Sequence, residues 1–162
     1  ISGAPAIKPR KMDFPFSDIT EKYFFDNNSI ISTYMAALSA TFPPGEKGFI
    51  DSVRNYRDQI TDPELQESIK GFIGQEGHHS YQHKEINKVL NDLGLFVHRI
   101  EKDLEKKISH DKGRLDKRDF LASTVGMEHI TAIMAEYILE NPHVLDPLPT
   151  SARELLLWQA VE

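Results

Sequence analysis

One apolar stripe in the middle of the chain constrains the fold more than any other feature. Along residues 63–93 its members are separated alternately by three and four positions, which places them on one face of a single long helix. Asp62 followed by Pro63 is a typical helix start, and Gly94 is a typical helix end. Both ends of the stripe are apolar, so we expect this face to point into a bundle. Its members are Ile69, Phe72, Glu76, His79, His83, Ile86, Leu90 and Leu93.

The rest of the chain predicts further helices between short breaks and no strands. An extended arm over residues 1–17, which hold three prolines, precedes a helical domain over residues 18–162. We expect the chain to stop inside its last helix, with part of the site missing. Helix after helix predicts an all-α bundle. Helices are expected over 18–39, 46–60, 63–93, 116–140 and from a cap at Ser151 onward, with a charged amphipathic segment over 96–108 and with breaks at Pro43-Pro44-Gly45 and in a polar loop over 112–117.

Composition narrows the classes of function. A net charge of -6 argues against nucleic acid as the main partner, because phosphate binding requires a basic face. The chain has no cysteine, which removes disulfides and thiolate metal sites and fits a cytoplasmic protein. No apolar run approaches the roughly 18 residues of a membrane span. A small-molecule substrate is therefore the expected partner.

Polar residues interrupt the apolar stripes of several predicted helices. Burying a carboxylate without a partner costs several kcal/mol, and a bound cation would offset that cost. In residues 63–93 the interruption is Glu76, His79 and His83. Glu128 stands alone among Leu121, Val125, Ala132, Ala135 and Leu139; Glu46 opens the stripe Phe49, Val53, Tyr56 and Ile60; and Glu162 follows Leu155 and Trp158.

This residue set predicts a metal site. Glu76 and His79 are three apart and project together, and four-helix carboxylate sites combine Glu-x-x-His pairs with single glutamates from other helices. Such donors suit two iron ions best, with manganese or zinc as alternatives. The predicted ligands are Glu46, Glu76, His79, Glu128, His83 and Glu162.

Two segments, FPPGEKGFIDSVR over 42–54 and FIGQEGHHSYQH over 72–83, resemble the family of predicted metal-dependent hydrolases. The resemblance covers most of the chain. It implies a ferritin-like bundle and site residues Glu46, Glu76, His79, His83 and Glu128. Gln159 departs from the histidine that the resemblance leads us to expect at this place in the last helix.

Structural explanations compete with each ligand assignment. Glu76 and His79 would otherwise form a buried ion pair, Glu46 would favour a helix N-terminus, and Glu128 would pair with Arg54. His83 is either a ligand or a hydrogen-bond donor beside the ligands. The remaining polar residues near the motifs are expected at the surface or beside the site: His78, His129, Tyr81, Gln75 and, in the polar loop, His110-Asp111.

The function remains open among several classes at this stage. A metal-dependent enzyme would activate water for hydrolysis or dioxygen for oxidation. Metal storage and a purely structural helical module are the alternatives. An apolar groove left by a missing helix would invite a homodimer. Phe24, Phe25, Tyr34 and Met35 are candidates for a pocket lining.

Overall fold

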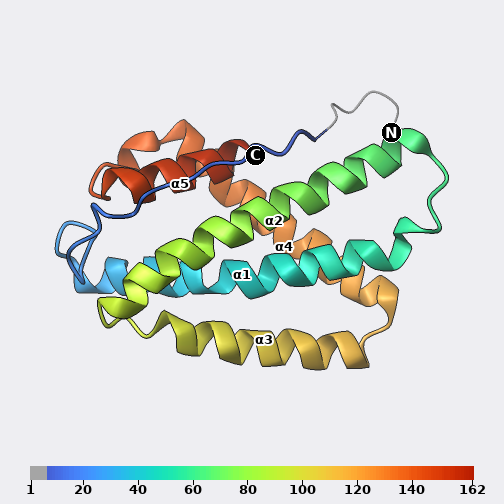
Figure 1. Cartoon of the computed structure of the whole chain (residues 1–162), viewed down its shortest axis with the longest axis horizontal. Coiled ribbons are helices and arrows are strands. Elements are labelled where there is room, and N and C mark those ends of the chain that lie inside the picture. Colours follow the sequence, from blue (N-terminus) through green and yellow to red (C-terminus); the bar gives the residue numbers. More distant parts are fainter. Residues whose placement is uncertain (1–6) are drawn as a thin grey trace.

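The computed structural model describes residues 7–162, which form helices and turns without a strand. The predicted all-α fold is confirmed, while the ferritin-like arrangement stays a prediction. Figure 1 shows α1 lying beside α2 and α3, with α4 passing behind them and α5 next to the N-terminal arm. The elements are α1 (Ser29–Arg57), α2 (Pro63–Asp92), α3 (Val97–Arg114), α4 (Lys117–Glu140), the short 3-10 helix η1 (Pro142–Leu145) and α5 (Thr150–Val161).

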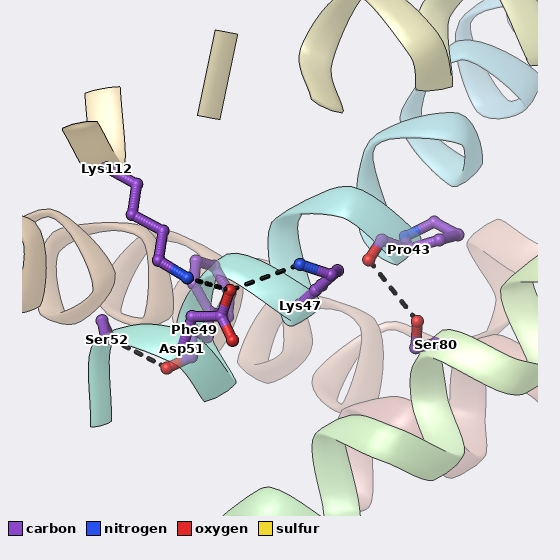
Figure 2. A network of polar contacts seen from close by, with 7 residues as sticks. All are labelled: Pro43, Lys47, Phe49, Asp51, Ser52, Ser80 and Lys112. Carbon is purple, nitrogen blue, oxygen red and sulfur yellow. Dashed lines mark hydrogen bonds and ion pairs between the residues drawn. The ribbon is translucent and has the colours of Figure 1, made fainter. Parts of the chain in front are cut away.

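Helix α1 runs unbroken through Pro43 and Pro44, so the prediction of two helices over 18–39 and 46–60 is wrong. Proline has no backbone N–H, and Pro43 therefore leaves the carbonyl of Ser39 without its helical donor. The side-chain amide of Asn87 on α2 donates to that carbonyl at 3.2 Å. Ser80, also on α2, donates to the carbonyl of Pro43 at 3.4 Å, as Figure 2 shows. The neighbouring helix thus supplies hydrogen bonds around the proline pair, which sequence periodicity does not reveal.

The first helix also begins later than predicted, at Ser29 rather than near residue 18. Asp26 and Asn27 both adopt positive φ angles, a conformation that interrupts a right-handed helix and that Asp and Asn tolerate better than most residues. The side chain of Asn28 then accepts hydrogen bonds from the N–H groups of Ile30 and Ile31, each at 3.1 Å. This cap satisfies the first free donors of α1.

Helix α3 continues to Arg114, so the predicted polar loop over 112–117 is wrong. Its last turns are held by ion pairs. Lys107 lies 2.6 Å from Asp111, and Lys112 reaches Asp51 of α1 at 2.8 Å (Figure 2). His110 is consequently an exposed helical residue rather than a loop residue.

Asp18, from the N-terminal segment, caps helix α5. The prediction that Ser151 is the cap is wrong. Ser151 lies in the first turn of α5, where its N–H donates to the carboxylate of Asp18 at 2.9 Å and its hydroxyl donates to the other oxygen. A carboxylate at a helix N-terminus also interacts favourably with the helix dipole. The N-terminal segment therefore anchors α5.

The N-terminal segment lies along α2, where a glycine allows its backbone to come close and a glutamine side chain forms hydrogen bonds with it. A Cβ atom at Gly71 would lie 2.3 Å from the carbonyl oxygen of Ile7, so only glycine permits this approach. The Gln82 amide donates to the carbonyl of Met12 at 2.6 Å and accepts from the N–H of Phe14 at 3.3 Å. The arm therefore covers the face of α2 next to α5.

The hydrophobic core joins this arm to α1, α2 and α5, including Phe16, Ala40, Leu90 and Leu155. Helix α4 contributes little to it, since only Phe120 and Thr124 of α4 are buried. The prediction that the α4 stripe points inward is wrong for Val125 and Leu139, which are 62% and 45% exposed.

Candidate metal centre

Three buried side chains from two helices come together at the centre of the bundle. Glu46 of α1 and Glu76 and His79 of α2 each offer one ligand atom, and these atoms all lie within 4.8 Å of one another. All three residues are buried. Two carboxylates and an imidazole at this separation have the geometry to hold one divalent ion.

The position of Glu46 excludes the explanation that it stabilises a helix N-terminus. Because α1 is continuous, Glu46 lies in the middle of a helix and not at an N-terminus. It is 1% exposed, and neither carboxylate oxygen has a hydrogen-bond partner among residues 7–162. Burial, followed by the charges of Glu76 and Glu128, raises the pKa of Glu46 well above its usual value. A carboxylate placed in this way is costly unless a cation or a proton accompanies it.

Glu76 and His79 lie within ion-pair distance of each other but are not hydrogen-bonded. Glu76 Oε1 and His79 Nδ1 are 3.9 Å apart, beyond hydrogen-bond distance. Burial and then the charge of Glu128 raise the pKa of Glu76 to about 8. Burial lowers the pKa of His79 to about 4. Near neutral pH both side chains are therefore uncharged without a metal, and His79 Nε2 has no hydrogen-bond partner among the described residues.

Glu128 approaches the same centre from α4. Its side chain is half-buried, and its Oε1 atom is buried without a hydrogen-bond partner among residues 7–162. Within those residues it forms no ion pair with Arg54, the partner that a structural role would require. The charge of Glu128 contributes to the raised pKa of both Glu46 and Glu76, so its carboxylate lies within electrostatic range of theirs, although Glu128 is outside the group of three whose ligand atoms lie within 4.8 Å of one another. Burial also raises the pKa of Glu128 itself, and the Thr131 hydroxyl partly offsets this.

His83 lies one turn from His79 but has both ring nitrogens engaged. Nδ1 is 2.9 Å from the hydroxyl of Ser39, and Nε2 is 2.7 Å from the side-chain oxygen of Gln159. Its ring stacks on Phe42 with centroids 4.3 Å apart. Burial lowers its pKa to about 4, so the imidazole is neutral. In this arrangement His83 offers no free nitrogen to a metal, and it joins α1, α2 and α5.

Glu162 also lies near the centre, and its carboxylate already has two partners within the chain. It forms an ion pair with Arg10 of the N-terminal arm, and the Gln75 amide donates both to its carboxylate, at 3.4 Å, and to its backbone carbonyl. Its charge acts to raise the pKa of His79, although burial outweighs this effect. Glu162 therefore contributes to the electrostatics of the cluster without being one of its three members.

The other polar residues near the motifs and the candidates for a pocket lining lie outside the Glu/His cluster. Tyr81, His129 and His110 are exposed and His78 is partly exposed, whereas Gln75 is buried, which its place off the apolar stripe did not indicate. Of the four pocket candidates, Phe24 and Met35 line a cavity of about 20 Å³ beside His83, and Tyr34 is exposed. This space admits no more than a water molecule.

Trp158 is the residue at this centre whose role the sequence did not indicate. Its ring meets His79 edge to face, with centroids 4.8 Å apart, and its indole nitrogen is buried without a partner among residues 7–162. Its spacing with Leu155 on the last helix signals burial, but only the packing of α5 against α2 brings it to His79.

The unpartnered atoms supply a test of whether a metal fits. Four buried ligand-type atoms lack hydrogen-bond partners among the described residues: both oxygens of Glu46, one of Glu128 and one nitrogen of His79. Native proteins leave few such atoms unpaired, and all four belong to residue types that bind divalent ions. The residues therefore fit a metal.

A family sequence profile agrees with this geometry. The profile described as predicted metal-dependent hydrolase matches residues 8–162. The chain belongs to this family. No curated protein and no solved structure matches the chain. Membership bears out the resemblance seen in the two sequence segments, and the Glu/His cluster is a place in the fold where a metal ion could be held. Across residues 7–162, none of the helices combines the length and the hydrophobicity that crossing a bilayer requires.

Proposed function

We propose that the chain is a metal-dependent hydrolase whose metal ligands are Glu46, Glu76 and His79, with Glu128 completing the set. The observation that carries this proposal is the group of buried, unpartnered ligand atoms from three helices. A divalent ion held there would supply Lewis acidity toward a substrate carbonyl or phosphoryl group and would lower the pKa of a water molecule. The substrate would be a small molecule, as the family description and the net charge of -6 suggest.

The protonation states of these side chains are compatible with metal binding. His79 is neutral at physiological pH, so a nitrogen lone pair is available as a ligand. Burial raises the pKa of Glu46 and Glu76, so without a cation each carboxyl keeps its proton to a higher pH than an ordinary glutamate does. Metal binding would therefore release protons. Glu128 is more exposed than the other two carboxylates and would face both the ion and an entering substrate.

A di-iron oxidase is the second candidate. Its support is the excess of carboxylates over imidazoles, which matches the donor set of bundles that bind two irons. Glu128 and, after release from Arg10, Glu162 would then provide carboxylate ligands for a second ion. Two ions per chain and oxidation of an organic substrate would favour this candidate over hydrolysis.

Elemental analysis combined with the fluorescence of Trp158 tests the proposal. Trp158 is the single tryptophan and contacts His79, so metal binding is expected to change its emission. The wild-type protein, Glu76→Gln, His79→Ala and the control His110→Ala would be stripped with a chelator and titrated with Fe²⁺, Mn²⁺ and Zn²⁺. His110 is an exposed histidine on α3 and leaves the centre intact.

We expect stoichiometric binding and hydrolysis of ester or phosphoester substrates in the wild type and His110→Ala, and loss of both in the other two variants. Equal metal binding in all four proteins would refute the ligand assignment. Metal binding with oxygen consumption and without hydrolysis would replace the hydrolase by the oxidase. No binding of any of the three ions to the wild type would refute both, and would leave a structural module whose buried polar groups serve packing alone.

A further inference from the structure

The outer face of α4 is apolar but uncovered by residues 7–162. Ile130, Ile133 and Tyr137 are 52%, 54% and 58% exposed. Helix α4 contacts the rest of the bundle through other positions, of which Phe120 and Thr124 are buried. Several large apolar side chains that lie together at the surface indicate a site of protein–protein contact. The outer face of α4 therefore has the character of an interface.

The exposed residues follow a seam with a helix-pairing repeat. Gly126, Ile130, Ile133 and Tyr137 are separated by four, three and four positions, which is the spacing of alternating core positions in paired helices. A Cβ atom built at Gly126 meets nothing within 4 Å. The seam thus has an open site at one end and a large aromatic ring at the other.

These four residues are complementary to themselves in one orientation only. When a second α4 is laid antiparallel on the first, Tyr137 of one copy faces the space beside Gly126 of the other, and Ile130 faces Ile133. Both contacts occur twice, as a two-fold interface requires. A parallel pairing would instead set Tyr137 against Tyr137 and leave the space at Gly126 empty.

Polar side chains beside the seam favour the same orientation. His129 and Glu136 are both exposed and lie along one edge of the seam, seven positions apart. In an antiparallel pair, residues on the same edge of the two helices face each other, so His129 of each copy meets Glu136 of the other. A parallel pair would place His129 opposite Met134 instead.

We propose that the protein forms a two-fold dimer in which α4 packs antiparallel on α4 of a second copy, along the seam Gly126, Ile130, Ile133 and Tyr137. This proposal is independent of the metal-dependent function, because the seam lies on the face of α4 opposite Glu128. Dimerisation would cover the apolar surface and hold α4 in place behind the metal ligands.

Sedimentation velocity of the full chain at concentrations from micromolar to millimolar tests the proposal. We expect a dimer in the wild type and in Ile30→Asp, a control that changes an exposed isoleucine of α1 outside the seam. Ile133→Asp buries a charge in the interface and is expected to weaken association by about a hundredfold or more. Circular dichroism would verify that each variant is folded.

A charge exchange tests the antiparallel register. His129→Glu opposes Glu136 of the other copy and should weaken the dimer by about tenfold, whereas His129→Glu combined with Glu136→Lys should restore it. A monomer at all concentrations would overturn the proposal, and so would a dimer that Ile133→Asp leaves intact. A dimer that weakens with Ile133→Asp but is not restored by the double exchange would refute the antiparallel register.

Discussion

Replacing Glu76 by Gln should have opposite effects on stability with and without metal. The pKa of this buried carboxyl is about 8, against a usual value of 4.5. A carboxyl with a raised pKa contributes stability that is fully present below pH 4.5 and is lost as the pH rises through about 8. At pH 8 this loss amounts to roughly 4 kcal/mol, because each pKa unit corresponds to about 1.4 kcal/mol.

The amide of Gln carries no charge and avoids that loss, although burying it without a partner costs about 1–3 kcal/mol. The metal-free variant should therefore be more stable than the wild type at pH 8 by about 1–3 kcal/mol, or about 3–10 °C in Tm. Metal should reverse the order. At a concentration about 1,000 times Kd it would stabilise the wild type by roughly 4 kcal/mol, and the variant far less because a ligand is missing.

Thermal unfolding with a chelator and with added metal measures both effects. The matched control is Glu67→Gln, also on α2, whose exposed side chain forms an ion pair with Lys70 at 3.7 Å and with no other residue of 7–162. This control should change Tm by less than about 2 °C in either condition. A Glu76→Gln protein that is less stable than the wild type without metal, yet gains as much from metal, would refute the reasoning and indicate a structural role.

Three further predictions follow from the surrounding contacts. Metal affinity should weaken by at least about tenfold for each pH unit below 8, because Glu76 must lose a proton to bind and the raised pKa of Glu46 adds to this dependence; a fluorescence titration giving a pH-independent Kd would contradict this. Asp18→Ala removes the cap of α5 and should destabilise the protein by about 1–2 kcal/mol in denaturant unfolding, whereas Ser151→Ala retains the backbone hydrogen bond and should cost less. Gly71→Ala should displace the N-terminal arm and speed its proteolysis, whereas Gly77→Ala on the same helix meets nothing within 4 Å and should leave the rate unchanged.

Much of the fold follows from local patterns that need no partner. The start of α2 is encoded by Asp62 and Pro63, whose cap and fixed φ angle act within one turn. The 3-4 spacing correctly predicted that Glu76 and His79 share a buried face, because helix geometry alone sets that relation. The boundaries near Pro43 and residue 18 were wrong because they depend on hydrogen bonds from α2 and on left-handed residues that leave no periodic signal.

The sequence alone therefore determined which residues are costly to bury, since a carboxylate on an apolar stripe needs compensation wherever the stripe packs. It also determined the all-α class and the family. Only the tertiary structure decided which of these residues meet. Glu46 lies close to Glu76 because α1 continues past its prolines. Both ring nitrogens of His83 are engaged because Ser39 and Gln159 lie within hydrogen-bond distance. Distances between helices depend on the packing of the whole bundle, and no local pattern contains them.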